Sequence, residues 1–466
     1  MATVVFDTPT WSKMNFGPCR LGNQKRTKRL QKVATQMANQ PEGSTPNQTE
    51  TWAALKAAYR LFNHPEVTFQ KIIAPHCQLT RECGQPGDVK LIICDTTEVD
   101  FTSLHKAKGL GPIGNGHGRG FFLHTAMMLD ARSHYVDGIA AAEIFHRKQK
   151  KGRKRHNNSK RRQADRESVV WGRVIDDAGR PPEGVRWIHV CDRGADDIEV
   201  MWRSIHQGCG FVIRAARLTR KIITPKGEKQ PLGDYLATLG AHGIRDVKVR
   251  ATSKTAARTA VVTLRFGALG IPLPSVTTPW LKEHRPVEPL HAGVVELLEI
   301  NPPKGLKPIR WVLYSETPIT TESEAESIIE KYEQRPTIED YHKAAKTGCS
   351  MEKRREQTSH ALENVVALCI VIAIRLLQLK MAAKETPGRP ARDLVPISWI
   401  RMLQQIREMP PNTEITIHDF VRQLAGLGGF LGRKGDGEPG WITLWRGLEK
   451  LILMLRGAAI KGVRSG

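Results

Sequence analysis

The sequence predicts an α/β fold flanked by helical regions at both ends of the chain. A helical, strongly basic pattern covers residues 1–70, strand-like apolar runs begin near Asp88, and a helical pattern returns after residue 316. With 466 residues, 40% of them apolar, the chain is long enough for about three domains with buried cores.

The balance of charge predicts a polyanionic partner. The formal net charge is +24, and each phosphate that a protein cation neutralises releases counterions and favours binding. Nucleic acid is therefore the leading partner. The longest apolar run, Val365 to Ile374, is too short to span a bilayer and predicts a buried helix. Without a signal-peptide pattern, and with eight scattered cysteines, we expect a cytoplasmic protein with reduced thiols.

Two helices are predicted near the N-terminus, at Asn23 to Asn39 and at Thr51 to Phe62. The first has an apolar stripe at helical spacing, formed by Leu30, Val33, Ala34 and Met37. Its other faces carry cations, of which Lys25, Arg26 and Arg29 are the candidates for DNA recognition. A solvated helical bundle is the alternative interpretation of this region.

The next region has the order βββαβαβ, which is the layout of the ribonuclease H-like fold. The predicted elements are strands Val89 to Asp95, Gly120 to Asp130 and Tyr135 to Phe145, a helix Ser168 to Asp177, a strand Trp187 to Asp192, a helix Asp196 to His206, and a strand Gly210 to Arg214. Asp95 and Asp192 each follow an apolar strand, and this fold delivers such carboxylates to one end of its sheet. An acid after a strand also commonly caps a turn or helix.

A β-rich insertion is predicted after this core. Its strands are Val247 to Ala251, Ala260 to Phe266, Val294 to Ile300 and Ile309 to Tyr314, separated by proline-rich loops.

The stretch Ile328 to Gly348 carries an unusual set of polar residues. In a single helix, at about 100° per residue, one face would combine a phenol, cations and one carboxylate. That face consists of Tyr332, Arg335, Glu339, Lys343 and Lys346. The opposite side, with Ile338, Tyr341, Ala344 and Ala345, predicts packing against a core. A solvated helix with Glu–Lys pairs is the simpler alternative.

The spacing Tyr-(2)-Arg-(3)-Glu-(6)-Lys resembles that of bacterial insertion-sequence transposases of the cut-and-paste, hairpin-forming kind. Further matches are Leu21 to Leu30, Glu299 to Gly305 with Arg310 and Trp311, and Ile374 to Lys380. The resemblance implies an Asp-Asp-Glu enzyme with a ribonuclease H-like core, an all-β insertion and helical terminal domains. Its expected domains are 1–70 for DNA binding, 71–220 and 316–380 for the core, 221–315 for the insertion and 381–466 for dimerisation.

The resemblance also implies residue roles. Asp95, Asp192 and Glu339 would be the catalytic metal ligands for two Mg²⁺ ions, with Mn²⁺ as a substitute. Phosphate-binding residues would be Arg214, Tyr332, Arg335, Lys343 and Lys346. Trp311 would help to hold a flipped base, or would be a core residue of the insertion. The partners would be transposon and target DNA and a second subunit, with no membrane.

Some features leave alternatives open. Pro336 stands where the family has an aromatic residue, and a helix that begins at Pro336 would leave Tyr332 and Arg335 on its approach. Other acids could replace the proposed ligands: Glu98, Asp100, Asp196, Asp197 and Asp340. The apolar stripe of a last helix, from Trp445 to Leu455, could face a partner or pack within the chain. The basic run 146–162 predicts a loop that adds nonspecific DNA affinity. A noncatalytic DNA-binding regulator and a nuclease without strand transfer are the alternative functions.

Overall fold

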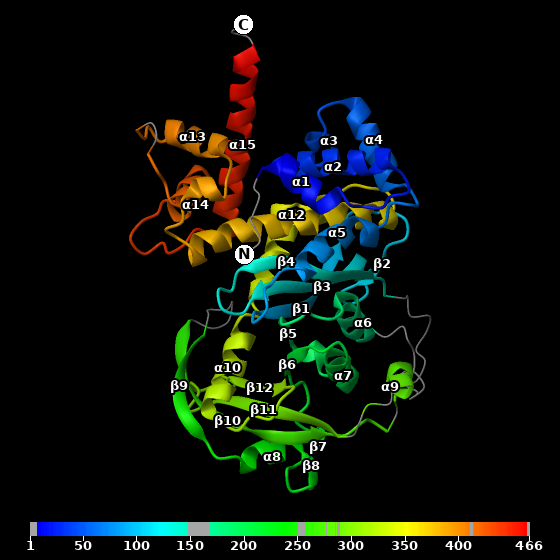
Figure 1. Ribbon diagram of the computed structural model, residues 1–466, viewed down its shortest axis with the longest axis vertical. Helices are drawn as coiled ribbons and strands as arrows, with labels where there is room; N and C mark the ends of the chain where they lie inside the picture. Colours follow the sequence, from blue (N-terminus) through cyan, green and yellow to red (C-terminus); the bar gives the residue numbers. More distant parts are fainter. Residues whose placement is uncertain are drawn as a thin grey trace. The chain divides into compact units, whose positions relative to one another are not determined.

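The computed structural model describes residues 7–147, 167–249, 257–275, 277–284, 286, 289–410 and 413–463. The chain forms two compact units (Figure 1). The first unit consists of Met1–Gln85, Thr96–Lys151 and Thr337–Gly466, and the second of Pro86–Asp95 and Gly152–Pro336. Most of the predicted basic run 146–162 lies outside the described residues.

The N-terminal part of the first unit is helical, as predicted. Its helices are α1 (Thr8–Phe16), α2 (Gln24–Asn39), α3 (Thr45–Gln48), α4 (Trp52–Phe62) and α5 (Phe69–Arg81). Asn23 and Thr51 cap α2 and α4 by accepting hydrogen bonds from main-chain N–H groups three residues on, which confirms both predicted starts. The predicted apolar stripe of α2 is buried. Sequence periodicity did not identify α1, α3 or α5.

The core of the first unit is the long helix α12 (Ser359–Glu385), which packs against α5 and strand β4 (Val136–Phe145) (Figure 1). Val365 to Ile374 are all buried, which confirms the prediction of a buried helix. The helix is long and apolar enough to cross a membrane, but 89% of its most apolar window is buried inside the protein. Its composition is therefore explained by its position in the core.

The strands of the first unit are β2 (Gly111–Ile113), β3 (Gly118–Asp130) and β4 (Val136–Phe145), paired antiparallel in sequence order. The Asp130 carboxylate accepts hydrogen bonds from the N–H groups of Arg132 and Ser133 and so closes the turn between β3 and β4. Strand β1 (Val89–Asp100) belongs to the second unit up to Asp95 and to the first from Thr96 onward.

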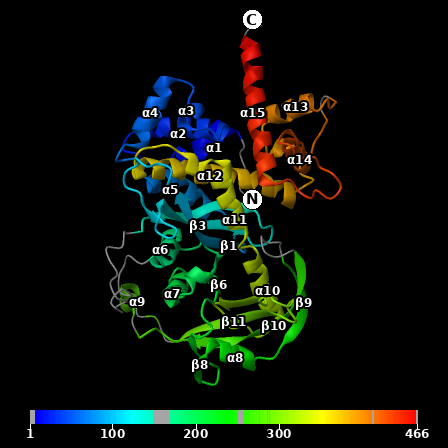
Figure 2. The same ribbon diagram turned by 180° about the vertical axis from the view of Figure 1, so that it is seen from behind.

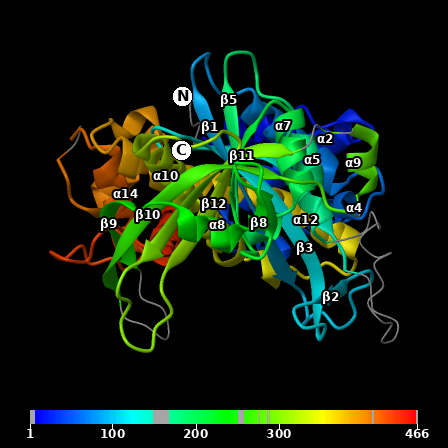
Figure 3. The ribbon, with the colours of Figure 1, turned by 90° about the horizontal axis from the view of Figure 1, so that it is seen from below.

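The second unit contains a mixed sheet (Figure 2). Its strands after β1 are β5 (Arg186–Cys191), β6 (Gly210–Arg214), β7 (Lys221–Ile223), β8 (Lys229–Pro231), β9 (His242–Val249), β10 (Arg258–Ile271), β11 (Leu290–Glu299) and β12 (Arg310–Ser315). β1, β5 and β6 are neighbouring parallel strands, and β12 joins β6 in antiparallel orientation. The predicted strands of the insertion are confirmed where they are described, and β9 to β12 pair antiparallel (Figure 3).

The helices of the second unit are α6 (Val169–Ala178), α7 (Ile198–His206), α8 (Leu232–Thr238), α9 (Pro279–His284) and α10 (Glu322–Glu333). A 3-10 turn, Arg193–Ala195, precedes α7. α6 and α7 confirm the two predicted core helices within two residues at each boundary. α10 begins with a capping box in which Thr321 and Glu324 satisfy each other's main-chain N–H groups.

The prediction that Ile328 to Gly348 is one helix is wrong, and the alternative in which a helix begins at about Pro336, after Tyr332 and Arg335, is confirmed. α10 ends at Glu333, Gln334 to Pro336 form a turn, and α11 (Thr337–Lys343) continues as a π-helix, Ala344–Gly348. A proline disfavours the helical conformation of the residue before it, so the break falls at Arg335. The predicted apolar side, with Ile338, Tyr341, Ala344 and Ala345, is buried as expected.

The remaining segments belong to the C-terminal part of the first unit. They are the 3-10 turns Met351–Lys353 and Ala391–Asp393 and the helices α13 (Ile397–Ile406), α14 (Ile417–Leu427) and α15 (Trp441–Val463). The first turns of α15 pack on α14, where the backbones at Gly428 and Gly447 come so close that a Cβ atom would collide. Leu444, Trp445, Leu448, Leu451 and Ile452 are buried there, while Leu453 is 50% exposed. The predicted stripe therefore packs largely within the chain.

Candidate active site

Asp95 and Asp192 lie on neighbouring parallel strands. Cys94 of β1 is in register with Cys191 of β5, so the two aspartates occupy the next position along each strand. The β1 strand continues to Asp100 instead of ending at Asp95, because Thr96, Thr97 and Val99 favour extended backbone. Asp95 therefore projects from within a strand, while Asp192 directly follows its strand.

The side chain of Arg335 lies between these two carboxylates. Its Nη2 atom is 3.0 Å from Oδ2 of Asp95 and 3.6 Å from Oδ2 of Asp192. All three side chains are partly buried, with exposed fractions of 15% for Asp95, 35% for Asp192 and 18% for Arg335. Since two adjacent carboxylates repel each other, a cation between them stabilises their ionised forms.

The turn at Gln334–Pro336 is what allows this geometry. The N–H of Arg335 donates to the carbonyl of Tyr332, and the chain then changes direction before α11 begins. Arg335 is thus not on the same helix as Glu339, which corrects the expectation of a single functional face.

Tyr332, Trp311 and Arg214 form a second group in the same unit. The rings of Tyr332 and Trp311 meet edge to face with their centroids 5.3 Å apart. Burial raises the pKa of the Tyr332 hydroxyl, and the nearby Arg214 partly offsets this effect. Arg214 donates to the carbonyl of Arg310 at 3.0 Å, and its Nε atom is buried without a hydrogen-bond partner among the described residues.

Trp311 is half-buried and is not one of the fully buried residues of the sheet. It lies on β12 opposite Leu297, and its ring reaches across to α10. The indole is therefore partly accessible to a ligand.

Glu339, Lys343 and Lys346 belong to the first unit. Glu339 and Lys343 are exposed residues of α11, and Lys346 is half-buried in the π-helix that follows. The Nζ atom of Lys346 lies 3.0 Å from Oε1 of Glu352, so this proposed phosphate ligand has an internal partner. The approach of Glu339 to Asp95 and Asp192 remains a prediction.

Most of the alternative acids have structural roles. Asp196 accepts from the N–H of Ala216 and pairs with Arg220, and Asp197 caps α7 through the N–H of Glu199. Asp100 accepts from Thr102, and Glu98 accepts from the N–H of Gly114. Asp340 is partly exposed next to Glu339. No group of three or more potential metal ligands is found within the described part of the chain.

The predicted DNA-recognition residues lie on the first turns of α2. Lys25 is exposed, Arg29 is half-buried, and Arg26 donates through Nη1 to the carbonyl of Leu21 at 2.7 Å. Arg26 therefore also holds the loop before α2, a contact that the sequence did not predict.

Two protein-family models match the chain, one at each end. The model described as "Transposase DNA-binding" matches residues 8–67, and the model described as "Transposase Tn5 dimerisation domain" matches residues 371–465. The chain belongs to the Tn5 transposase family. The first match contains α1 to α4, and the second extends from within α12 to α15. This Tn5-family transposase thus has a DNA-binding domain at its N-terminus and a dimerisation domain at its C-terminus.

The family assignment confirms the resemblance drawn from the sequence. It also makes DNA and a second copy of the Tn5-family transposase its expected partners. The matched residues do not include Asp95, Asp192 or the Tyr-Arg-Glu-Lys stretch, so the roles of these residues rest on the geometry described above.

Proposed function

We propose that the protein is an Asp-Asp-Glu transposase that cuts DNA at transposon ends, forms and resolves a hairpin, and joins the ends to target DNA. The observation that carries this proposal is the cation shared by Asp95 and Asp192 at adjacent positions of two parallel strands. Two carboxylates held this close provide a site for divalent cations as well as for a guanidinium.

The donor set fits magnesium. Mg²⁺ prefers hard oxygen ligands and keeps several waters, so a few carboxylates suffice. Asp95 and Asp192, joined by Glu339, would hold two Mg²⁺ ions, with Mn²⁺ as a substitute. When bound, such ions would activate the attacking oxygen and neutralise charge on the reacting phosphate.

The protein's own groups would position the DNA. Arg335 can present its guanidinium to phosphate oxygens in a bidentate manner once the DNA enters, and Arg214 offers a second guanidinium beside Tyr332. The Tyr332 hydroxyl stays protonated at neutral pH because burial raises its pKa, so it can donate a hydrogen bond to a phosphate. Lys343 and Lys346 would extend this contact, Lys346 after release from Glu352.

Trp311 adds a stacking surface next to the phosphate ligands. Its ring is already held at one edge by Tyr332, and aromatic rings stack on unpaired bases of any sequence. A base extruded during hairpin formation would find this ring within the same group of residues.

The strand pattern supports a ribonuclease H-like core for this enzyme. β1, β5 and β6 are parallel, β3 and β4 form an antiparallel pair, and helices α6 and α7 follow in the expected order. The antiparallel strands β9 to β12 support the all-β insertion. Lys25, Arg26 and Arg29 would contact the element ends, and the enzyme would act in the bacterial cytoplasm at the nucleoid.

Cleavage of supercoiled plasmid carrying candidate element ends tests the proposal. In Mg²⁺, the wild type should nick and linearise the plasmid, while Asp192→Asn and Glu339→Ala should lose at least about a thousandfold in rate, as loss of a metal ligand removes charge stabilisation in the transition state. Asp234→Asn, which changes an exposed acid at the start of α8, should cleave like the wild type.

Cleavage that persists in both acid variants would overturn the assignment of these ligands. Binding of the ends without cleavage by the wild type would favour a noncatalytic regulator. Cleavage without joined products would favour a nuclease.

A further inference from the structure

A cavity of about 420 Å³ opens beside Asp192 within the second unit. Its walls come from the turn after β5, the loop after β6, and the segment that carries α9. Arg193, the residue that follows Asp192, is part of the first wall. The cavity is therefore adjacent in the chain to one proposed metal ligand, but it contains neither that ligand nor the Tyr332–Trp311 group.

The cavity is lined by more cations than carboxylates. Arg220 is neutralised by Asp196, with Nη2 and Oδ1 2.5 Å apart, and Asp197 is used as the cap of α7. Arg193, Arg217 and Lys221 also line the cavity. Each of the three is exposed, and none forms an ion pair with a residue that the structure describes. Arg193, Arg217, Arg220 and Lys221 line the cavity with only two carboxylates, Asp196 and Asp197, and this excess of positive charge favours an anionic ligand.

Part of the cavity lining is an apolar wall. It is formed by Pro272, Leu273, Pro274 and Leu281. A cavity that combines such a wall with several cations suits a ligand with one apolar face and one anionic group, and its volume is within the range of small-molecule sites.

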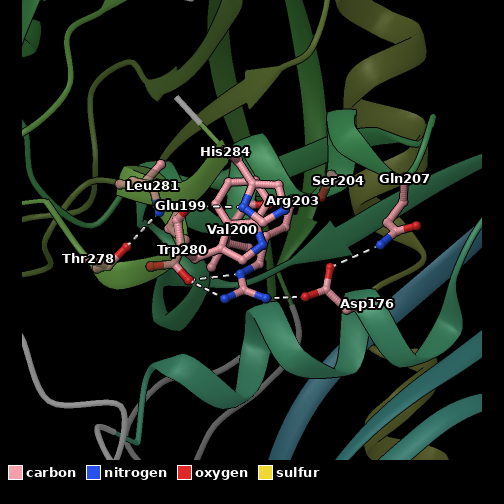
Figure 4. A network of polar contacts seen from close by, with 10 residues as sticks. All are labelled: Asp176, Glu199, Val200, Arg203, Ser204, Gln207, Thr278, Trp280, Leu281 and His284. Carbon is pink, nitrogen blue, oxygen red and sulfur yellow. Dashed lines mark hydrogen bonds and ion pairs between the residues drawn. The ribbon is translucent and has the colours of Figure 1, made fainter. Parts of the chain in front are cut away.

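Leu281, the α9 residue of the apolar wall, is held in place by contacts of α9 with α7 (Figure 4). Trp280 lies over the guanidinium of Arg203, with a distance of 4.8 Å to the ring centroid, and stacks on His284 at 4.1 Å. Arg203 is itself fixed by Glu199, at 2.6 Å, and by Asp176. These contacts fix Leu281 at the edge of the cavity before any ligand binds.

We propose that this cavity binds one unpaired nucleotide of the DNA strand beside the cut. Its phosphate would lie on Arg217 and Lys221, and its sugar and base on the proline–leucine wall. The proposal rests on the proposed function, because strand cutting and hairpin formation supply unpaired nucleotides next to Asp192.

Photocrosslinking in the absence of metal tests the site independently of catalysis. The probe is an element-end duplex with a short unpaired end that carries 4-thiothymidine, irradiated with the full-length protein in EDTA. Peptide mapping should place crosslinks on the peptides that contain Arg217 to Lys221 or Pro272 to Leu281. The double variant Arg217→Ala/Lys221→Ala should reduce this crosslink at least tenfold. It should also reduce the slope of log binding constant against log salt concentration by about 0.7 for each phosphate that the protein no longer neutralises.

Lys282→Ala is the matched control, since Lys282 is an exposed cation of α9 that does not line the cavity. It should crosslink like the wild type. Leu273→Ser should weaken the crosslink without changing the salt dependence of binding, because it alters only the apolar wall.

Crosslinks confined to other peptides, or equal losses of the crosslink in the control and the double variant, would overturn the inference. A wild type that cleaves DNA but gives no crosslink here would refute this site and leave the proposed function intact. A crosslink here from a wild type that does not cleave DNA would support this site and count against the proposed function.

Discussion

Arg335 and Asp95 are joined by an ion pair of 3.0 Å, and the same Nη2 atom also approaches Asp192 at 3.6 Å. The guanidinium therefore lies between the two carboxylates that we expect to bind a divalent cation. Because the guanidinium already neutralises part of the charge of these carboxylates, a divalent cation that binds here would compete with it. A DNA phosphate that draws Arg335 away would at the same time leave the carboxylates available to metal.

We therefore expect Arg335→Ala to bind Mn²⁺ more tightly than the wild type when no DNA is present. Removing one competing, partly exposed cation should raise the affinity by about tenfold, which corresponds to about 1.4 kcal/mol. Electron paramagnetic resonance of free Mn²⁺ measures the change directly.

Arg214→Ala is the control for this prediction, since Arg214 lies in the same unit but forms no ion pair with Asp95 or Asp192. It should leave the Mn²⁺ affinity unchanged. Equal affinities for wild type and Arg335→Ala would show that the ion pair does not obstruct the metal site.

A buried histidine should make the protein sensitive to acid. His76 of α5 contacts Asn15 Oδ1 through Nδ1 at 2.7 Å and accepts from the N–H of Ile139 through Nε2 at 3.1 Å. The neutral ring satisfies both contacts, and burial lowers its pKa to about 4. Between about pH 6.5 and pH 4 the unfolded chain binds a proton that the folded chain does not, so stability falls as the pH falls.

Urea unfolding at pH 7 and pH 4.5 tests this expectation. The difference in pKa corresponds to at most about 3 kcal/mol at the lower pH. In His76→Gln the part of the pH dependence due to this ring should vanish, although the variant is less stable at neutral pH. An unchanged slope of stability against pH in that variant would rule out His76 as the origin.

The sequence predicted the strands and the two aspartates because each signal is local. The apolar runs that become β5 and β6 are short, bounded by turns or helices, and followed closely by polar residues, so periodicity alone locates them. The same local analysis left two outcomes open at Arg335, one continuous helix or a helix that begins at Pro336. An ideal helix through Tyr332 and Glu339 requires that Pro336 be tolerated, and the structure instead breaks the helix at that point.

Other features could not be predicted because they depend on contacts between distant parts of the chain. The pairing of Asp196 with Arg220, which removes a candidate metal ligand, joins the turn after β5 to the loop after β6. The pairing of Lys346 with Glu352 depends on the π-helix, which carries no clear sequence pattern. Such contacts follow from tertiary packing and not from the local conformational propensities of the residues.

A buried arginine links the two ends of the chain within the first unit. Arg375 of α12 is 3% exposed and lies between the rings of Trp11 of α1, at 5.3 Å, and Trp399 of α13, at 5.9 Å. Burial lowers its pKa to about 10, so it remains charged at neutral pH and the cation–π contacts are formed in a dry environment.

Arg375→Ala should therefore destabilise the protein by about 2–4 kcal/mol, because it leaves a cavity between helices from both ends of the chain. Urea unfolding monitored by tryptophan fluorescence reports both stability and the altered ring environment. Arg446→Ala, which removes an exposed arginine of α15, should change stability by less than about 0.5 kcal/mol. Similar losses in both variants would mean that the buried contact contributes nothing specific.

We expect the exposed side of α15, and not the buried stripe on its other side, to contact a second subunit. The helix lies inside the segment matched by the Tn5 dimerisation model, and one side of it already packs on α14. Leu453 and Met454 remain 50% and 40% exposed, as expected for residues that a second subunit would cover.

Leu453→Glu places a charge in that surface without disturbing the buried side of α15. It should weaken dimerisation on DNA at least tenfold and leave the unfolding midpoint unchanged. Analytical ultracentrifugation with element-end DNA measures the dimer fraction. Lys450→Glu is the comparison, because it also introduces a glutamate at an exposed position about one turn earlier. The Nζ atom of Lys450 contacts the carbonyl of Leu427. A dimer fraction lowered equally by both variants would attribute the effect to charge alone, whereas a loss confined to Leu453→Glu would locate the subunit contact on this side of α15.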